Sequence, residues 1–168
     1  MNLYLDTSAL VKLYVADESA DLVREAVAQA RLVATAAIAY VEARAAFARR
    51  RHEGALPPPE HRRIVHDLDA DWGHYLRIEI TESLIREASR LAERHRLRAY
   101  DAIHLASATT LKSRLADTVV FACWTPSSKP PLTEKASTSS PGERCAAEQG
   151  CGAQKLRSFP ACPANLSC

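Results

Sequence analysis

Short apolar runs separated by amphipathic stretches predict alternating strands and helices in the first 124 residues. The runs at 3–5, 32–34 and 119–123 are continuous, which is typical of strands buried on both faces of a parallel sheet. The run at 76–80 alternates apolar and polar residues, as expected for a strand with one buried face. Apolar residues at helical spacing fill the intervals between these strands.

The predicted helices are bounded by capping and breaking residues. A short helix begins near Thr7 or Ser8, and Thr35 is the expected cap of a long helix that ends before Gly54 and the prolines 57–59. The other helices are expected at 19–29, 59–72, 81–95 and 99–115. Strands that alternate with helices predict an α/β fold, with helices on the faces of a parallel sheet.

Composition divides the 168-residue chain after Trp124. Residues 125–168 contain four of the five cysteines and six of the nine prolines, but no valine, isoleucine or tyrosine. A segment without branched apolar residues cannot build a core, so we expect disorder there. The predicted organisation is one folded domain at 1–124 followed by a low-complexity tail at 125–168.

Charge and hydropathy narrow the class of protein only a little. The net charge is +2, and no apolar run approaches the roughly 20 residues that a membrane span needs. The N-terminus lacks the basic and apolar regions of a signal peptide. We therefore expect a cytoplasmic protein with no membrane partner.

Three acidic residues lie where a parallel α/β sheet gathers its ligands. Asp6 follows the first strand, and the carboxyl ends of the strands form the usual binding edge. Glu42 has small apolar neighbours on its helix face, and Asp101 begins an alanine-rich helix. The alternatives are an N-cap for Asp6, an ion pair with Arg44 or a neighbouring arginine for Glu42, and a helix-dipole contact for Asp101.

Three carboxylates from separate elements suit a hard cation such as Mg²⁺, with Mn²⁺ as the alternative ion. Residues 1–124 contain no cysteine or histidine set at zinc spacing and no glycine-rich phosphate loop. A metal held by carboxylates needs no serine or cysteine nucleophile.

These residues resemble the motifs of a known family. The sequence LDTSAL at 5–10, Glu42 in a mid-chain helix, and YDAIHLA at 100–106 are similar to the PIN-domain ribonucleases, in particular the VapC-type toxins of bacterial toxin–antitoxin pairs. The resemblance implies a three-layer α/β/α sandwich with a parallel sheet. It also implies a Mg²⁺-dependent endoribonuclease that hydrolyses RNA phosphodiester bonds, forms a homodimer and is inhibited by a cognate antitoxin protein.

Residue by residue, the resemblance assigns Asp6, Glu42 and Asp101 to the acidic metal site and Ser8 to the support of Asp6. Arginine clusters are candidates for RNA contacts, and we single out Arg49, Arg50, Arg96 and Arg98. Solvated helix faces are the alternative for most of these arginines. His104, three residues after Asp101, is interpreted as structural.

The chain departs from the family at the end of the last predicted strand. The family has a further aspartate there, but this chain has Trp124-Thr125. In the shifted reading frame, the last base of the Trp124 codon and the first two bases of the Thr125 codon read GAC, which encodes aspartate. We therefore interpret 125–168 as a frameshifted tail that replaces the last part of the family fold.

The missing acid leaves a second function open, namely a catalytically impaired module that binds antitoxin or RNA without cleaving. A phosphatase that uses Asp6 as nucleophile ranks lower, because its usual second aspartate is replaced by Ser8. A zinc site in the tail would use Cys145, Cys151, Cys162 and Cys168, but five intervening residues within each pair exceed the usual spacing.

Overall fold

Five strands form one sheet in the order β3-β2-β1-β4-β5. The computed structural model describes residues 1–16, 20–115, 118–124 and 156–158. The strands are β1 (Asn2–Leu5), β2 (Leu32–Ala36), β3 (Leu76–Ile78), β4 (Val119–Ala122) and β5 (Leu156–Ser158). The first four are parallel, and β5 pairs antiparallel with the outer edge of β4.

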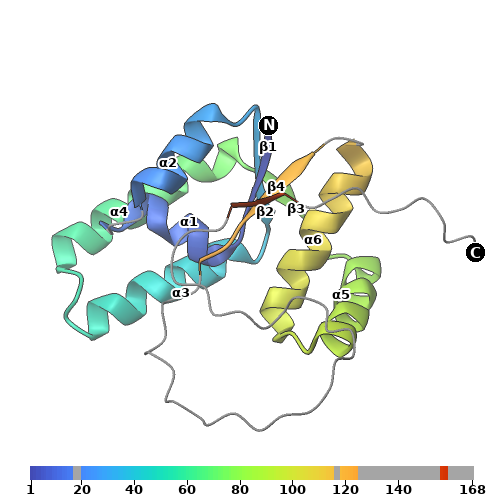
Figure 1. Cartoon of the computed structure of the whole chain (residues 1–168). Coiled ribbons are helices and arrows are strands. Elements are labelled where there is room, and N and C mark those ends of the chain that lie inside the picture. The colour runs from blue at the N-terminus through green and yellow to red at the C-terminus, as the bar shows by residue number, and fades with distance from the viewer. Residues whose placement is uncertain (17–19, 116–117, 125–155, 159–168) are drawn as a thin grey trace, which may run out of the picture.

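Six α-helices connect and cover the strands of the described chain (Figure 1). They are α1 (Thr7–Tyr14), α2 (Ala20–Gln29), α3 (Ala39–His52), α4 (Pro58–Asp71), α5 (Glu82–His95) and α6 (Ala99–Leu115). A short 3₁₀ helix, Trp72–His74, leads from α4 into β3. No helix in the described part of the chain is long and apolar enough to cross a membrane.

Alternate side chains of β1 divide the core into two layers. Leu3 and Leu5 pack with apolar residues of α1 to α4, whereas Tyr4 packs with those of α5 and α6. Figure 1 shows these two groups of helices on opposite faces of the sheet. The predicted three-layer α/β/α sandwich with a parallel sheet is confirmed.

The structure corrects the predicted start of the long helix. Thr35 was expected to cap the long helix, but it is a fully buried residue of β2, and α3 starts only at Ala39. The Thr35 hydroxyl donates to the carbonyl oxygen of Leu5 at 2.8 Å. The side chain therefore ties β2 to β1, because a central strand offers a buried threonine a backbone acceptor.

Most of the predicted tail lies outside the described residues, as do the four cysteines proposed for a zinc site. Within that region the structure describes only β5, whose three residues pair with Val120, Phe121 and Ala122. The interpretation of 125–168 as a frameshifted tail stays a prediction.

Candidate active site

The candidate site lies at the carboxyl ends of the neighbouring strands β1 and β4. Asp6 follows β1 directly, and its backbone N–H donates to the carbonyl oxygen of Ala122 at the end of β4. Trp124 follows β4, and its backbone N–H donates to Ser8 Oγ at 2.6 Å. The chain segments that leave β1 and β4 are thus joined by hydrogen bonds at this edge of the sheet.

Asp6 both caps α1 and presents a carboxylate to this edge. Its Oδ1 accepts from the Ser8 hydroxyl at 2.6 Å and from the backbone N–H of Ala9 at 2.8 Å. Burial raises the pKa of Asp6, although the bonds from Ser8 and Ala9 and the nearby His104 ring lower it in part. The N-cap alternative is therefore correct for one oxygen of Asp6.

Glu42 lies in the first turn of α3, half-buried against α1 and α6. Its Oε2 accepts from the Thr7 hydroxyl at 2.5 Å and lies 2.9 Å from His104 Nε2. Burial raises the pKa of Glu42, but the bonds from His104 and Thr7 outweigh it, and the net pKa is lowered. The alternative of an ion pair with Arg44 is wrong, because Arg44 Nη1 donates to Tyr40 Oη at 2.8 Å and lies 3.5 Å from Asp69.

One pocket of about 1000 Å³ brings the predicted acids together. Asp6, Glu42 and Asp101 all line it, and Ser8 lies beside them. Asp101 is exposed in the first turn of α6, whereas Asp6 and Glu42 are partly buried. The carboxylates of Asp6 and Glu42 are therefore oriented by hydrogen bonds, whereas the carboxylate of Asp101 is accessible to solvent.

The carboxylates suit a hydrated divalent cation better than a closed metal cage. Among the described residues, no three His, Cys, Asp or Glu side chains form a group that could already hold a metal ion. Mg²⁺ keeps several waters and needs only one or two direct carboxylates, and its preferred ligands are oxygen atoms. The donor set of this pocket fits that requirement.

Three of the four predicted RNA-contacting arginines line the same pocket. Arg49 and Arg50 come from the last turn of α3, and Arg98 comes from the residues before α6. Arg96 does not line the pocket; it is the C-cap of α5, with a left-handed φ of 53°. The structure thus gives Arg96 a backbone role at the end of a helix.

The sequence interpretation missed two polar residues of the site, Thr7 and His104. The His104 side chain is only 5% exposed and contacts both Thr7 and Glu42. Its spacing of three residues from Asp101 placed it near the site, but nothing in the sequence paired it with Glu42, which lies 62 residues earlier.

Lys12 and Trp124 complete the wall of the pocket. The Lys12 ammonium lies 4.3 Å from the centre of the Trp124 ring, within the range of a cation–π contact. Both residues line the pocket with the arginines. The wall thus combines positive charge with an aromatic face beside the carboxylates.

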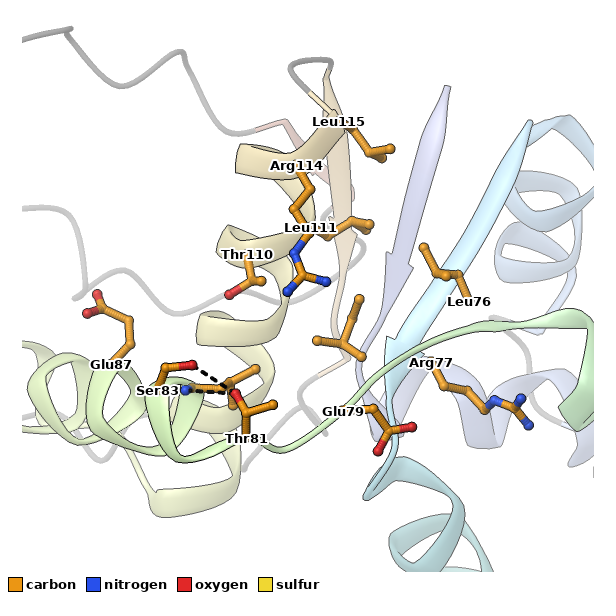
Figure 2. Close-up of a pocket in the computed structure, with 12 residues that line it drawn as sticks. Leu76, Arg77, Glu79, Thr81, Ser83, Glu87, Thr110, Leu111, Arg114 and Leu115 are labelled. Carbon is orange, nitrogen blue, oxygen red and sulfur yellow. Dashed lines mark hydrogen bonds between the residues drawn. The ribbon is translucent and has the colours of Figure 1, made fainter.

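A second pocket, of about 450 Å³, lies at β3 and beside α5 and α6 (Figure 2). Leu76, Leu111 and Leu115 contribute apolar surface to it. Its Thr81 hydroxyl contacts Ser83 Oγ at 2.9 Å and caps α5 by accepting from Leu84 N, as the dashed lines in Figure 2 show. The Thr81 hydroxyl is used to cap α5, and none of the three predicted acids lines this pocket. The first pocket is therefore the better candidate for an active site.

Comparison with known proteins identifies related sequences. The sequence profile of the PIN domain matches residues 3–119. Ribonuclease VapC45 from Mycobacterium tuberculosis (strain CDC 1551 / Oshkosh) is 32% identical over 105 residues, which are 62% of this chain and 73% of the relative. Ribonuclease VapC49 from M. tuberculosis (strain ATCC 25618 / H37Rv) matches with the same identity and coverage.

Solved structures share the fold at lower identity. The M. tuberculosis VapC20 crystal structure, described as a sarcin-ricin loop cleaving toxin, has a TM-score of 0.52 and 16% identity. The match covers 68% of this chain and 83% of that one. A toxin–antitoxin complex from Klebsiella pneumoniae has a TM-score of 0.50 and 20% identity, over 66% and 80% of the two chains. At these identities, the two structures show a common fold.

Proposed function

Because this chain belongs to the PIN domain family, we propose that it is a divalent-metal-dependent endoribonuclease and the toxin of a toxin–antitoxin pair. The observation that carries the proposal is the pocket at the carboxyl ends of β1 and β4, which gathers Asp6, Glu42 and Asp101 beside three arginines. The names of two relatives, ribonucleases at 32% identity, support the same reaction class.

The three carboxylates would hold the cation, with Mg²⁺ preferred and Mn²⁺ as a substitute. When bound, such an ion polarises a phosphate and lowers the pKa of a coordinated water. Asp6 is fixed by Ser8 and Ala9, and Glu42 by Thr7 and His104. Since these bonds restrict both side chains before the cation arrives, little reorganisation is needed on binding.

Arg49, Arg50 and Arg98 would bind the phosphates of the RNA on either side of the scissile bond. All three line the pocket that holds the carboxylates, so the negative charge of the backbone can be balanced next to the cation. Arginine also matches phosphate geometry with two parallel N–H donors. Their role is to orient the substrate, and the reaction itself needs no serine or cysteine.

An antitoxin protein is the partner that this function requires, since an unrestrained ribonuclease would damage its own cell. The K. pneumoniae structure with the same fold is a toxin–antitoxin complex, which supports this part of the proposal. We further propose a homodimer acting in the cytoplasm, where RNA is accessible. Light scattering of the purified chain would measure directly whether it is a dimer.

Cleavage of a mixed RNA pool by the purified chain tests the proposed reaction. We expect cleavage with Mg²⁺, loss of cleavage with EDTA, and loss with Asp6→Asn. Asp21→Asn is the matched control, because its exposed carboxylate on α2 pairs with Arg24 and does not line the pocket. Cleavage that survives both EDTA and Asp6→Asn would exclude the proposed site.

A module that binds RNA or antitoxin without cleaving is the second candidate, and the Trp124-Thr125 sequence favours it. This position lacks the aspartate that the family resemblance places after the last strand. Folded protein that shifts RNA in a gel but leaves it intact with Mg²⁺ would support this candidate over the nuclease.

A further inference from the structure

A chain of hydrogen bonds, fully buried at its Tyr4 end, runs from the sheet to Glu42 through the ring of His104. Tyr4 Oη lies 3.0 Å from His104 Nδ1, and His104 Nε2 lies 2.9 Å from Glu42 Oε2 and 3.0 Å from Thr7 Oγ1. Tyr4 is fully buried, and the His104 side chain is 5% exposed. Side chains of three elements, β1, α1 and α6, therefore converge on one carboxylate of α3.

Counting protons assigns the direction of each bond in this chain. The Thr7 hydroxyl donates its single proton to Glu42 Oε2, so its oxygen can only accept from His104. His104 Nε2 is therefore protonated, and its N–H donates to both Thr7 Oγ1 and Glu42 Oε2. In the neutral ring, Nδ1 is then an acceptor, and the buried Tyr4 hydroxyl donates to it.

Packing fixes the ring as well as its protons. Tyr4 contacts His104 edge to face, with ring centres 6.1 Å apart, and stacks on Phe121 of β4 with centres 5.4 Å apart. A rotation of the His104 ring would break bonds at both nitrogens. The orientation of Glu42 is thus set by residues of β1, α1 and α6, with Phe121 of β4 packed against Tyr4.

We propose that His104 is a positioning residue that holds the Glu42 carboxylate in place for a divalent cation. The inference rests on the proposed metal-dependent function. Oε2 of Glu42 is taken by the Thr7 and His104 donors, and the part of the chain that the structure describes gives Oε1 no hydrogen bond. That leaves the second oxygen available to the cation or its water shell. Hydrogen bonds to ligating carboxylates commonly change metal affinity by about 10–100-fold.

The test compares two substitutions at position 104 in the full chain. His104→Met fills a similar volume but removes the donor, whereas His104→Gln can place an amide N–H near the former Nε2. We expect His104→Met to weaken Mn²⁺ binding about 10-fold, measured by electron paramagnetic resonance of free Mn²⁺. His104→Gln should restore most of that affinity.

Two controls separate positioning from a loss of stability. Leu111→Val shortens a buried side chain two turns further along α6, so it lowers the melting temperature without touching Glu42 and should leave Mn²⁺ affinity unchanged. In a Glu42→Gln background, His104→Met should cause no further loss of Mn²⁺ affinity, because the carboxylate on which it acts is gone.

The outcomes distinguish this inference from the proposed function. Equal Mn²⁺ affinity of His104→Met and the unchanged chain would overturn the inference, even if both cleave RNA with Mg²⁺. Loss of Mn²⁺ affinity with rescue by His104→Gln would support it, even if no variant cleaves RNA and the nuclease proposal fails. An unchanged chain that binds no Mn²⁺ would overturn the inference too.

Discussion

Asp6 caps α1 and also lines the candidate pocket, and its hydrogen bonds and its buried charge have opposite effects on stability. Oδ1 accepts the bonds from Ser8 and Ala9 that begin α1, which stabilises the fold. The negative charge, however, is partly removed from water, and burial raises the pKa of the carboxyl group. Ionised Asp6 is thus costly to the fold without a cation.

Asp6→Asn should therefore stabilise the metal-free chain at neutral pH. Asparagine keeps an oxygen acceptor and is as good an N-cap as aspartate, but it carries no charge. We expect an increase of about 1 kcal/mol in the free energy of unfolding, measured by urea denaturation in EDTA. Asp6→Ala, which loses the cap as well, should be about 1 kcal/mol less stable than Asp6→Asn.

The raised pKa of Asp6 makes the difference in stability between the unchanged chain and Asp6→Asn depend on pH. The folded chain binds a proton at Asp6 more readily than the unfolded chain does, so its stability relative to Asp6→Asn rises as pH falls through the raised pKa. The gap between the two proteins should narrow in mild acid. An Asp6→Asn variant that is less stable than the unchanged chain at pH 7 in EDTA would contradict this account.

Among the elements, the segment that follows α5 holds two of the arginines predicted to contact RNA, and the structure places them differently. Arg96 terminates the helix with φ 53°, and its backbone N–H donates to the carbonyl oxygen of Ala92. A left-handed conformation is strained for any residue with a Cβ and free of that strain for glycine. Arg98, only two residues later, lines the pocket.

Arg96→Gly should raise stability by about 0.5–1 kcal/mol and leave RNA affinity unchanged. Arg98→Ala should instead weaken RNA binding and reduce its salt dependence, while barely affecting the melting temperature. Filter binding at two salt concentrations, together with thermal unfolding, measures both effects. A loss of RNA affinity in Arg96→Gly equal to that in Arg98→Ala would contradict this expectation and support the prediction that both arginines contact RNA.

The helices and strands also show which features of the fold can be predicted from sequence patterns. The helix 99–115 and the strand that begins at 119 were predictable, because apolar periodicity and capping residues act locally. Thr35 was not, because its hydroxyl bonds to Leu5, 30 residues earlier, and only the pairing of β1 with β2 creates that acceptor. Similarly, the three acids were predictable from local pattern, Asp6 after a strand, Glu42 among small apolar residues and Asp101 in a first turn. The contact of His104 with Glu42 depends instead on packing between α3 and α6.

At the scale of the whole molecule, the sequence that follows β4 bears on the choice between the proposed nuclease and the proposed module that binds without cleaving. The backbone N–H of Trp124 is bonded to Ser8, which in turn is bonded to Asp6. The family resemblance places a further aspartate at the next position of the chain, where this sequence has Thr125. Sequencing of the gene would also show whether GAC follows the Trp124 codon in the shifted frame, as the frameshift interpretation requires.

Thr125→Asp should increase Mn²⁺ affinity about 10-fold and increase, or create, Mg²⁺-dependent RNA cleavage, since affinity for hard cations depends on the number of charged oxygen ligands. Ser128→Asp adds the same charge three residues later and is the matched control. Equal effects of the two substitutions would mean that the added charge acts over a distance and that position 125 is not part of the site.

Both layers of the core contain buried tyrosines whose ionisation would destabilise the fold. Tyr4 lies in the α5–α6 layer, and Tyr14 and Tyr75 lie in the α1–α4 layer, where their hydroxyls are 2.8 Å apart. Tyr14 also donates to Asp71 Oδ2 at 3.1 Å. Burial raises the pKa of all three, and for Tyr14 the bonds to Tyr75 and Asp71 raise it further.

The fold should therefore lose stability steeply above about pH 10, where the unfolded tyrosines release protons that the folded ones keep. Each affected tyrosine contributes a loss of about 1.4 kcal/mol per pH unit, so three give up to about 4 kcal/mol per unit. Urea denaturation from pH 8 to pH 11 measures this slope. Tyr4→Phe should lower this slope by about a third, because one of the three buried hydroxyls is then absent. A flat profile to pH 11 would mean that these hydroxyls ionise inside the fold, and hence that water reaches both layers of the core.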